Sequence, residues 1–266
     1  MVEISEEDRQ LFHEGVAYSS PKGEVKEKKE KKSSTAFSIA KVFGYMAIAL
    51  LITTAVAFGV GALISSIFYS DLHNEGELLI TYFVILIVSA IALFIDVIVI
   101  HFMVARDKHS IMVPGIIYAV LIGVLFSMLT IIIDWRLLGM AFGITALTFV
   151  LMGLIAFLSK GNMAPLLIVI MGLAIGIGVL SLVHWIYAIA TGTVINGLYL
   201  GISIAIFALL MFVTIYDMWR IKEIAEQGAM SKNVALYSAF IIYVDFINIF
   251  IRILYFLLII LSKSKK

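Results

Sequence analysis

The last long apolar run of the chain contains residues that could do chemistry. The stretch YVDFINIFIRIL, residues 243–254, places a carboxylate, an amide and a guanidinium among Ile, Phe and Leu. On an α-helix they share one stripe with two further polar residues: Ser238, Asp245, Asn248, Arg252 and Tyr255. The opposite face is apolar: Ile242, Phe246, Ile249, Phe250 and Ile253. We therefore expect the polar stripe to face other helices or a water-filled cavity.

A second carboxylate precedes this run. Asp217, in TIYDMWRI, is expected to end the preceding apolar segment, and Asp245 lies about 11 residues into the next one. Two carboxylates within reach of each other cannot both ionise easily, so such a pair titrates as a unit. Protonated, the pair can hold two helices together. Deprotonated, it repels itself and presents hard oxygens to a cation, with Ca²⁺ preferring six to eight such ligands.

The composition defines the surroundings of these residues. Of 266 residues, 62% are hydrophobic and 14% are charged, whereas soluble domains have roughly 25% charged residues. The apolar runs are continuous, which favours membrane-spanning helices over a barrel. Charges inside a bilayer are costly, so those that remain suggest function. The absence of cysteine excludes disulfides and thiolate chemistry, and a net charge of +1 gives no indication of nucleic-acid binding.

The predicted fold is an all-α integral membrane protein with seven transmembrane helices. A flexible, charged cytoplasmic segment is expected at 1–36 and a basic tail at 262–266. The expected spans are residues 37–69, 78–104, 111–133, 137–159, 164–190, 195–217 and 234–261.

The distribution of Lys and Arg predicts the orientation. Seven lysines between Lys22 and Lys41 place the N-terminus in the cytoplasm, and the loop SDLHNEGE, without Lys or Arg, suits the outside. The tail SKSKK would then lie outside, against the rule. Either the first six spans decide the orientation, or the seventh segment enters and returns; its length favours crossing. The absence of cysteine and the short loops favour a bacterial plasma membrane.

Other intramembrane polar residues have less definite roles. Arg252 needs an anion from another helix, and Asp96 in the second span is a candidate partner. Alternatively, Asp245 and Arg252 hold helices together, although they lie about 10 Å apart along the helix axis. His101 and His184 are expected to be packing residues. No metal-ligand spacing, nucleotide-binding loop or nucleophile–base pair is present, so we expect neither an enzyme nor a bound cofactor.

The end of the chain resembles the C-terminal signature of the Bax inhibitor-1 family, the transmembrane Bax inhibitor motif proteins. Tyr216-Asp217, a charged loop, Asp245-Phe246-Ile247-Asn248 and then Arg252 match that signature in order and spacing. The opening of the first span and Asp96 agree with it, and a bacterial-type member is indicated.

The resemblance implies a bundle in which six helices surround the last one. It also implies a pH-sensitive, passive calcium leak, with Asp217 and Asp245 as a proton-sharing, gating pair that binds Ca²⁺ weakly and transiently. In bacterial members an arginine in the second helix is described as a latch for this pair. Here that helix has Asp96 and His101 and no buried arginine, so what replaces the latch is open.

Several alternatives remain. A proton-coupled cation exchanger could use the same carboxylates, and a non-transporting protein could modulate stress or cell-death signalling through partners the sequence does not identify. An intramembrane aspartyl protease is disfavoured, because IYV stands where Gly-x-Gly would precede the second Asp. A retinal-type receptor is excluded, since the seventh segment has no lysine before Lys263.

Overall fold

The structure is a computed structural model that describes residues 21–70, 75–106, 110–159, 161–193 and 195–264. Within these residues it contains seven helices, each long and apolar enough to cross a membrane. They are α2 (Pro21–Ser70), α3 (Glu75–Arg106), α4 (Met112–Ile132), α5 (Trp135–Leu158), α6 (Ala164–Thr191), α7 (Asn196–Glu226) and α8 (Lys232–Ser264). The predicted all-α membrane fold is confirmed. Residues 1–20 and 265–266 of the predicted terminal segments lie outside the described residues.

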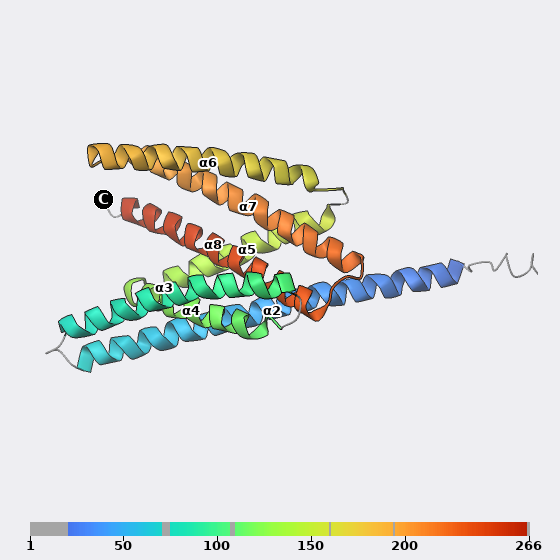
Figure 1. The fold of residues 1–266 in the computed structure, drawn as a ribbon, viewed down its shortest axis with the longest axis horizontal. Coiled ribbons are helices and arrows are strands. Elements are labelled where there is room, and N and C mark those ends of the chain that lie inside the picture. Colours follow the sequence, from blue (N-terminus) through green and yellow to red (C-terminus); the bar gives the residue numbers. More distant parts are fainter. Residues whose placement is uncertain (1–20, 71–74, 107–109, 160, 194, 265–266) are drawn as a thin grey trace, which may run out of the picture.

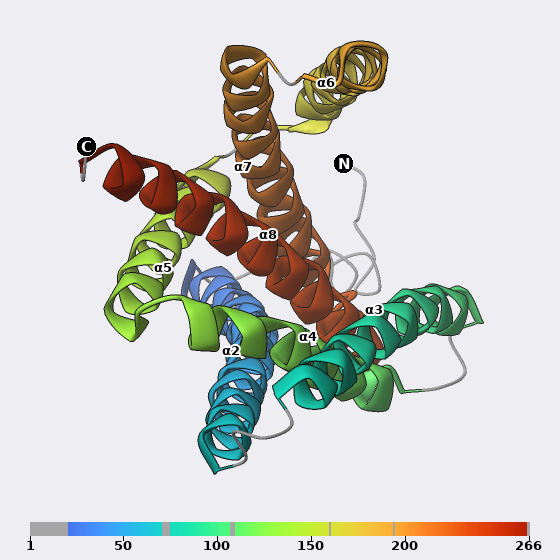
Figure 2. The same ribbon diagram turned by 90° about the vertical axis from the view of Figure 1, so that its left-hand side faces the viewer.

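The helices form two groups that α8 joins (Figure 1). α2 packs along α4, and α3 packs on α4. α5, α7 and α8 pack against one another, and α8 also packs on α2. α6 lies at the periphery beside α7, as the end-on view shows (Figure 2).

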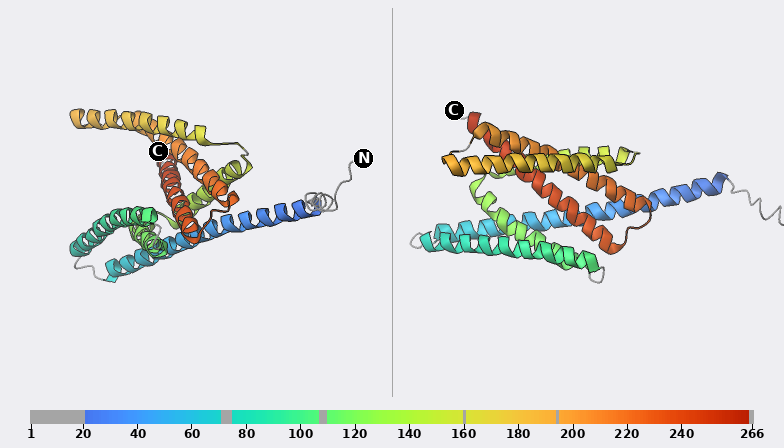
Figure 3. Two further views of the ribbon diagram at one scale, coloured as in Figure 1. Left: turned by 45° about the vertical axis from the view of Figure 1, so that its right-hand side comes forward. Right: turned by 45° about the horizontal axis from the view of Figure 1, so that its top comes forward.

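The first helix begins earlier than predicted. α2 starts at Pro21, inside the segment expected to be flexible, and its first part projects beyond the other helices (Figure 3). Proline suits the first helical position, because the N–H that it lacks has no partner there. Lys and Glu, which dominate the residues that follow, are good helix formers, so the helix of the first span extends backwards.

The sixth span is longer than predicted, and this changes the position of Asp217. α7 continues to Glu226, nine residues beyond Asp217, so this aspartate does not end the helix. The hydropathy falls after Asp217, but a buried stripe continues through Met218, Ile221 and Ala225 at helical spacing. An amphipathic extension of about two and a half turns therefore follows the apolar part of the helix and packs on the bundle.

The middle of α8 is the most deeply buried part of the bundle. Ile242, Tyr243 and Ile249 are at most 1% exposed, and Phe246 is 3% exposed. The helix contacts α2, α5 and α7. Whether all six other helices surround it stays a prediction.

Helices α2 and α4 approach each other closely at Gly123, a glycine that the sequence did not single out. A β-carbon at Gly123 in α4 would lie 2.8 Å from the Thr53 carbonyl oxygen and 2.7 Å from Val56 Cβ in α2. At Gly172 and Gly176, two glycines spaced four residues apart in α6 as in a small-xxx-small packing motif, a β-carbon would meet nothing within 4 Å. Close packing therefore occurs between α2 and α4, and α6 exposes its glycines.

We expect Gly123→Ala to destabilise the bundle by about 1–3 kcal/mol, because the new methyl group must push α2 and α4 apart. Gly115→Ala in the same helix is the matched control, since a β-carbon there meets nothing within 4 Å. The free energy of unfolding of both variants in bicelles checks this. Equal stability of the two variants would contradict the tight α2–α4 contact.

Candidate functional site

The site lies where α7 and α8 face each other. A short turn joins the two helices, with Gly228 in the left-handed region (φ 72°) that glycine adopts without strain. The chain therefore reverses, and α7 and α8 pack against each other. This reversal brings the two aspartates of the predicted pair to one helix interface.

Asp245 is the buried member of the pair. It is 7% exposed, and its Oδ2 has no hydrogen-bond partner within the described part of the chain. Its carboxyl group lies within hydrogen-bonding reach of the Thr214 hydroxyl and within electrostatic range of Asp217, both on α7. A buried carboxyl group with an unpaired oxygen is costly to maintain, which is typical of functional positions.

Asp217 is more accessible to solvent than Asp245. It is half-buried, and Arg220, one turn further along α7, acts on it electrostatically. Both residues line a pocket of about 430 Å³, whose other walls include Ser238 and Asn233 of α8. The pair is thus asymmetric: Asp217 borders the pocket, and Asp245 lies one turn of α8 deeper than its last lining residue, Ile241.

Thr214 is the partner that the sequence reasoning missed. It is fully buried, and its hydroxyl donates a hydrogen bond of 2.9 Å to the Leu210 carbonyl oxygen. Because its only proton is used there, its lone pairs remain to accept a hydrogen bond from a protonated Asp245. The available signal was its spacing, three residues before Asp217 and hence on the same face of α7.

Comparison with known proteins decides the family. The family model described as inhibitor of apoptosis-promoting Bax1 matches residues 36–263. The chain belongs to the Bax inhibitor-1 family. No curated protein matches the chain. Nearly all of the described bundle is therefore covered by this Bax inhibitor-1 match.

The rest of the predicted polar stripe is less buried than Asp245. Ser238 is 4% exposed and lines the pocket, whereas Asn248, Arg252 and Tyr255 are half-buried. The Tyr255 ring packs edge-on against Tyr199 of α7 at 6.1 Å between centroids. The stripe thus continues along the α7–α8 side of this family member, beyond the aspartate pair.

The structure does not bring Asp96 and Arg252 together. Among the described residues the ion pair present is Lys222–Glu226, at 4.0 Å, and the electrostatic neighbour of Asp96 is Tyr118 of α4. Counted from the same end of the bundle, Asp96 lies about 15 Å along α3 and Arg252 about 30 Å along α8. This difference in depth separates them. Asp96 is itself 8% exposed, and its Oδ2 lacks a partner within the described residues.

The two histidines are placed apart from the pair. Nδ1 of His101 lies 2.8 Å from the Val97 carbonyl oxygen of its own helix. His184 is 6% exposed and stacks near Tyr199, with 6.1 Å between ring centroids. In the described part of the chain, no group of three or more His, Cys, Asp or Glu side chains could hold a metal ion. Any calcium ligation at Asp217 and Asp245 would thus rely on two carboxylates, backbone or amide oxygens and water.

A lysine fixes the end of the bundle next to the pocket. Nζ of Lys222 donates hydrogen bonds to the carbonyl oxygens of Phe157 (3.0 Å) and Ser159 (2.8 Å). These groups lie at the C-terminal end of α5, where carbonyls lack partners within the helix and attract a cation. The contact ties the extended end of α7 to α5, and so positions the helix that carries Asp217.

Proposed function

We propose that this protein is a pH-sensitive, passive calcium leak gated by Asp217 and Asp245. The observation that carries the proposal is the buried Asp245 carboxyl group, which faces Asp217 and Thr214 across the α7–α8 interface with one oxygen that has no partner among the described residues. Membership of the Bax inhibitor-1 family supports the choice of ion and of gating group.

The pocket supports a route for ions to the pair. It opens at the end of the bundle that is predicted to be cytoplasmic, and its polar lining includes Asp217, Asn233 and Ser238. A hydrated cation can enter such a space and exchange water for carboxylate oxygens. Arg220, exposed at the same pocket, is a cation that opposes the accumulation of further cations there.

Protonation then controls the interface. With one proton shared, Asp245 can donate to Thr214 or Asp217, and α7 and α8 are held together. Without that proton, two negative charges lie at one interface, and their repulsion separates the helices. The two carboxylates then offer oxygen ligands to Ca²⁺. We therefore expect flux to rise with pH.

The stripe beyond Asp245 explains why the flux would be a leak. A cation that passes Asp245 meets Asn248 and then the half-buried guanidinium of Arg252. Arginine next to a pore is an electrostatic barrier to cations. We expect slow passage, without tight storage of calcium.

The test distinguishes a leak from proton-coupled exchange, which would use the same carboxylates. Purified protein in liposomes is given a calcium gradient alone, or a pH gradient without a calcium gradient. A leak carries calcium only down its own gradient. Uphill calcium movement driven by the pH gradient would show an exchanger, and no calcium movement under either condition would rule out transport.

A further inference from the structure

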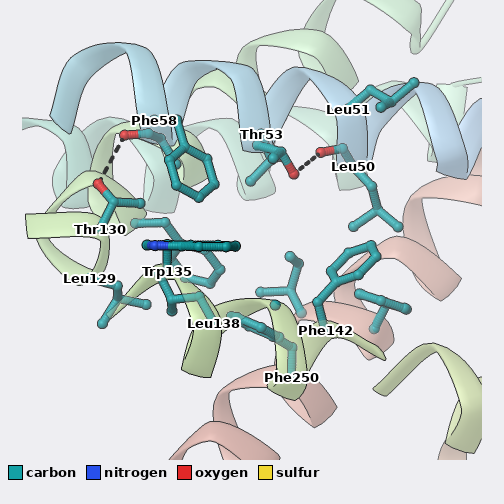
Figure 4. A pocket seen from close by; sticks show the side chains of 16 residues that line it. Leu50, Leu51, Thr53, Phe58, Leu129, Thr130, Trp135, Leu138, Phe142 and Phe250 are labelled. Carbon is teal, nitrogen blue, oxygen red and sulfur yellow. Dashed lines mark hydrogen bonds between the residues drawn. The ribbon is translucent and has the colours of Figure 1, made fainter. Parts of the chain in front are cut away.

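A second cavity lies on the other side of α8, and the transport mechanism does not use it. Its volume is about 420 Å³, and α2, α4, α5 and α8 form its walls (Figure 4). The aromatic side chains around it are Phe58, Phe126, Trp135, Phe142, Phe246 and Phe250. We call this cavity the α2–α5 groove.

The groove opens toward the bilayer. Several of its lining residues are exposed on the outside of the bundle: Leu51 by 69%, Trp135 by 69%, Phe58 by 46% and Phe142 by 43%. In a membrane-spanning protein this surface meets lipid, so hydrocarbon has direct access to the groove.

The threonine hydroxyls that line the groove are already engaged in hydrogen bonds with the protein. They donate to backbone carbonyl oxygens: Thr53 to Ala119 (3.0 Å), Thr54 to Leu50 (2.8 Å) and Thr130 to Ser127 (2.8 Å). Water or an ion would therefore lose hydrogen bonds or ligands on entering. The part of the occupant inside the groove must be hydrocarbon.

A positively charged side chain, Arg136, lies at one end of the α2–α5 groove. Trp135 begins α5, and the guanidinium of the exposed Arg136 lies 5.7 Å from the centroid of the Trp135 ring. The Asp134 carboxylate caps α5, because it accepts a hydrogen bond from the Arg136 backbone N–H (2.8 Å). Trp and Arg at a helix end are typical of the headgroup level of a membrane.

The length of the groove matches one leaflet. From Phe58 to Leu50 it runs about 12 Å along α2. One leaflet contributes about 15 Å of hydrocarbon. A chain anchored by its headgroup at Arg136 would therefore lie along the groove.

From these observations we propose that the α2–α5 groove is a binding site for one anionic phospholipid, with an acyl chain in the groove and its phosphate on Arg136. The chain would contact Phe246, Ile247 and Phe250, the residues of α8 that follow Asp245. Occupancy would brace α8 from the side opposite the aspartate pair. The site does not depend on calcium transport.

Photo-crosslinking tests the site. The full-length protein is reconstituted with phosphatidylglycerol that carries a photoreactive group on one acyl chain, and labelled residues are mapped by mass spectrometry. We expect saturable labelling at Leu50, Leu51 and Trp135, above that at Ile175 on the exposed face of α6.

Two glycines of α5 provide matched variants. A β-carbon meets nothing within 4 Å at Gly139, which lines the groove, or at Gly143, which does not. Gly139→Leu should fill the groove and reduce its labelling by about tenfold or more, while Gly143→Leu leaves it unchanged. Arg136→Gln should weaken labelling by phosphatidylglycerol by about fivefold, the effect of one cation near an anionic lipid surface.

Three results would overturn the proposal. Groove labelling that is no stronger than labelling at Ile175 would show only the surrounding lipid. Labelling unaffected by Gly139→Leu or by Arg136→Gln would place the lipid elsewhere. Crosslinks between two chains through groove residues would show a second copy of the protein as the occupant.

Discussion

Asp245→Asn is expected to remove the pH dependence of calcium flux and to keep flux low. Asparagine has the shape of the protonated acid and can hydrogen-bond to Asp217 or Thr214, but it cannot become negatively charged. The interface would stay closed at every pH. At the alkaline end of the range we expect calcium entry into liposomes to fall by about tenfold or more, since even one pKa unit of lost charge interaction corresponds to 1.36 kcal/mol.

Two further variants show whether the loss of pH dependence arises from the aspartate pair. Asp217→Asn should also flatten the pH profile, but less completely, because the buried Asp245 remains titratable. Asp134→Asn is the control, since that exposed aspartate caps α5 and lies outside the site. If Asp245→Asn kept the pH profile of the wild type, the pair would not be the gate.

Tyr243→Ala is expected to cause the largest loss of stability. The side chain is 1% exposed, and its hydroxyl lies 2.6 Å from the Thr53 hydroxyl of α2. Since Thr53 donates its own proton to Ala119, Tyr243 is the donor in this bond. Its ring packs edge-on against Tyr118 of α4, at 5.9 Å. Removing the ring leaves a cavity among three helices, at a cost of about 3–5 kcal/mol.

The conservative variant separates packing from hydrogen bonding. Tyr243→Phe keeps the ring and should cost only about 1 kcal/mol, the usual scale of one hydrogen bond between membrane helices. Tyr187→Ala, on α6 and 40% exposed, should change the free energy of unfolding by no more than about 0.5 kcal/mol. Unfolding in bicelles measures all three. Equal losses for Tyr243→Ala and Tyr187→Ala would contradict the packing described for α8.

Much of the fold could be predicted because bilayer insertion depends on hydropathy. The spans at 111–133 and 164–190 differ from α4 and α6 by only one residue at any end. The predicted helix ends differ from the observed ones where a helix continues beyond its apolar run. α7 runs nine residues past Asp217, because a narrow stripe including Ile221 packs on the bundle after the apolar run has ended.

The candidate site was predictable in part. Asp245 could be predicted because an acidic residue is costly within an apolar run. Asp217 could be predicted because its spacing from Asp245 resembles the family signature. Thr214 gave no comparable signal, since threonine is unremarkable in a membrane helix. The α2–α5 groove was not predictable, because it forms only where α2 and α8 pack beside α4 and α5, and its lining is apolar like any other lipid-facing surface.

Calcium entry as a function of pH tests the proposed gate most directly. Wild-type protein in liposomes, with equal pH on both sides, is measured from about pH 5.5 to 8, so that calcium entry is compared at acidic and alkaline pH. We expect slow, passive entry that rises with pH by about tenfold or more across the range. Entry that is absent at every pH, or that does not change with pH, would contradict a leak gated by Asp217 and Asp245.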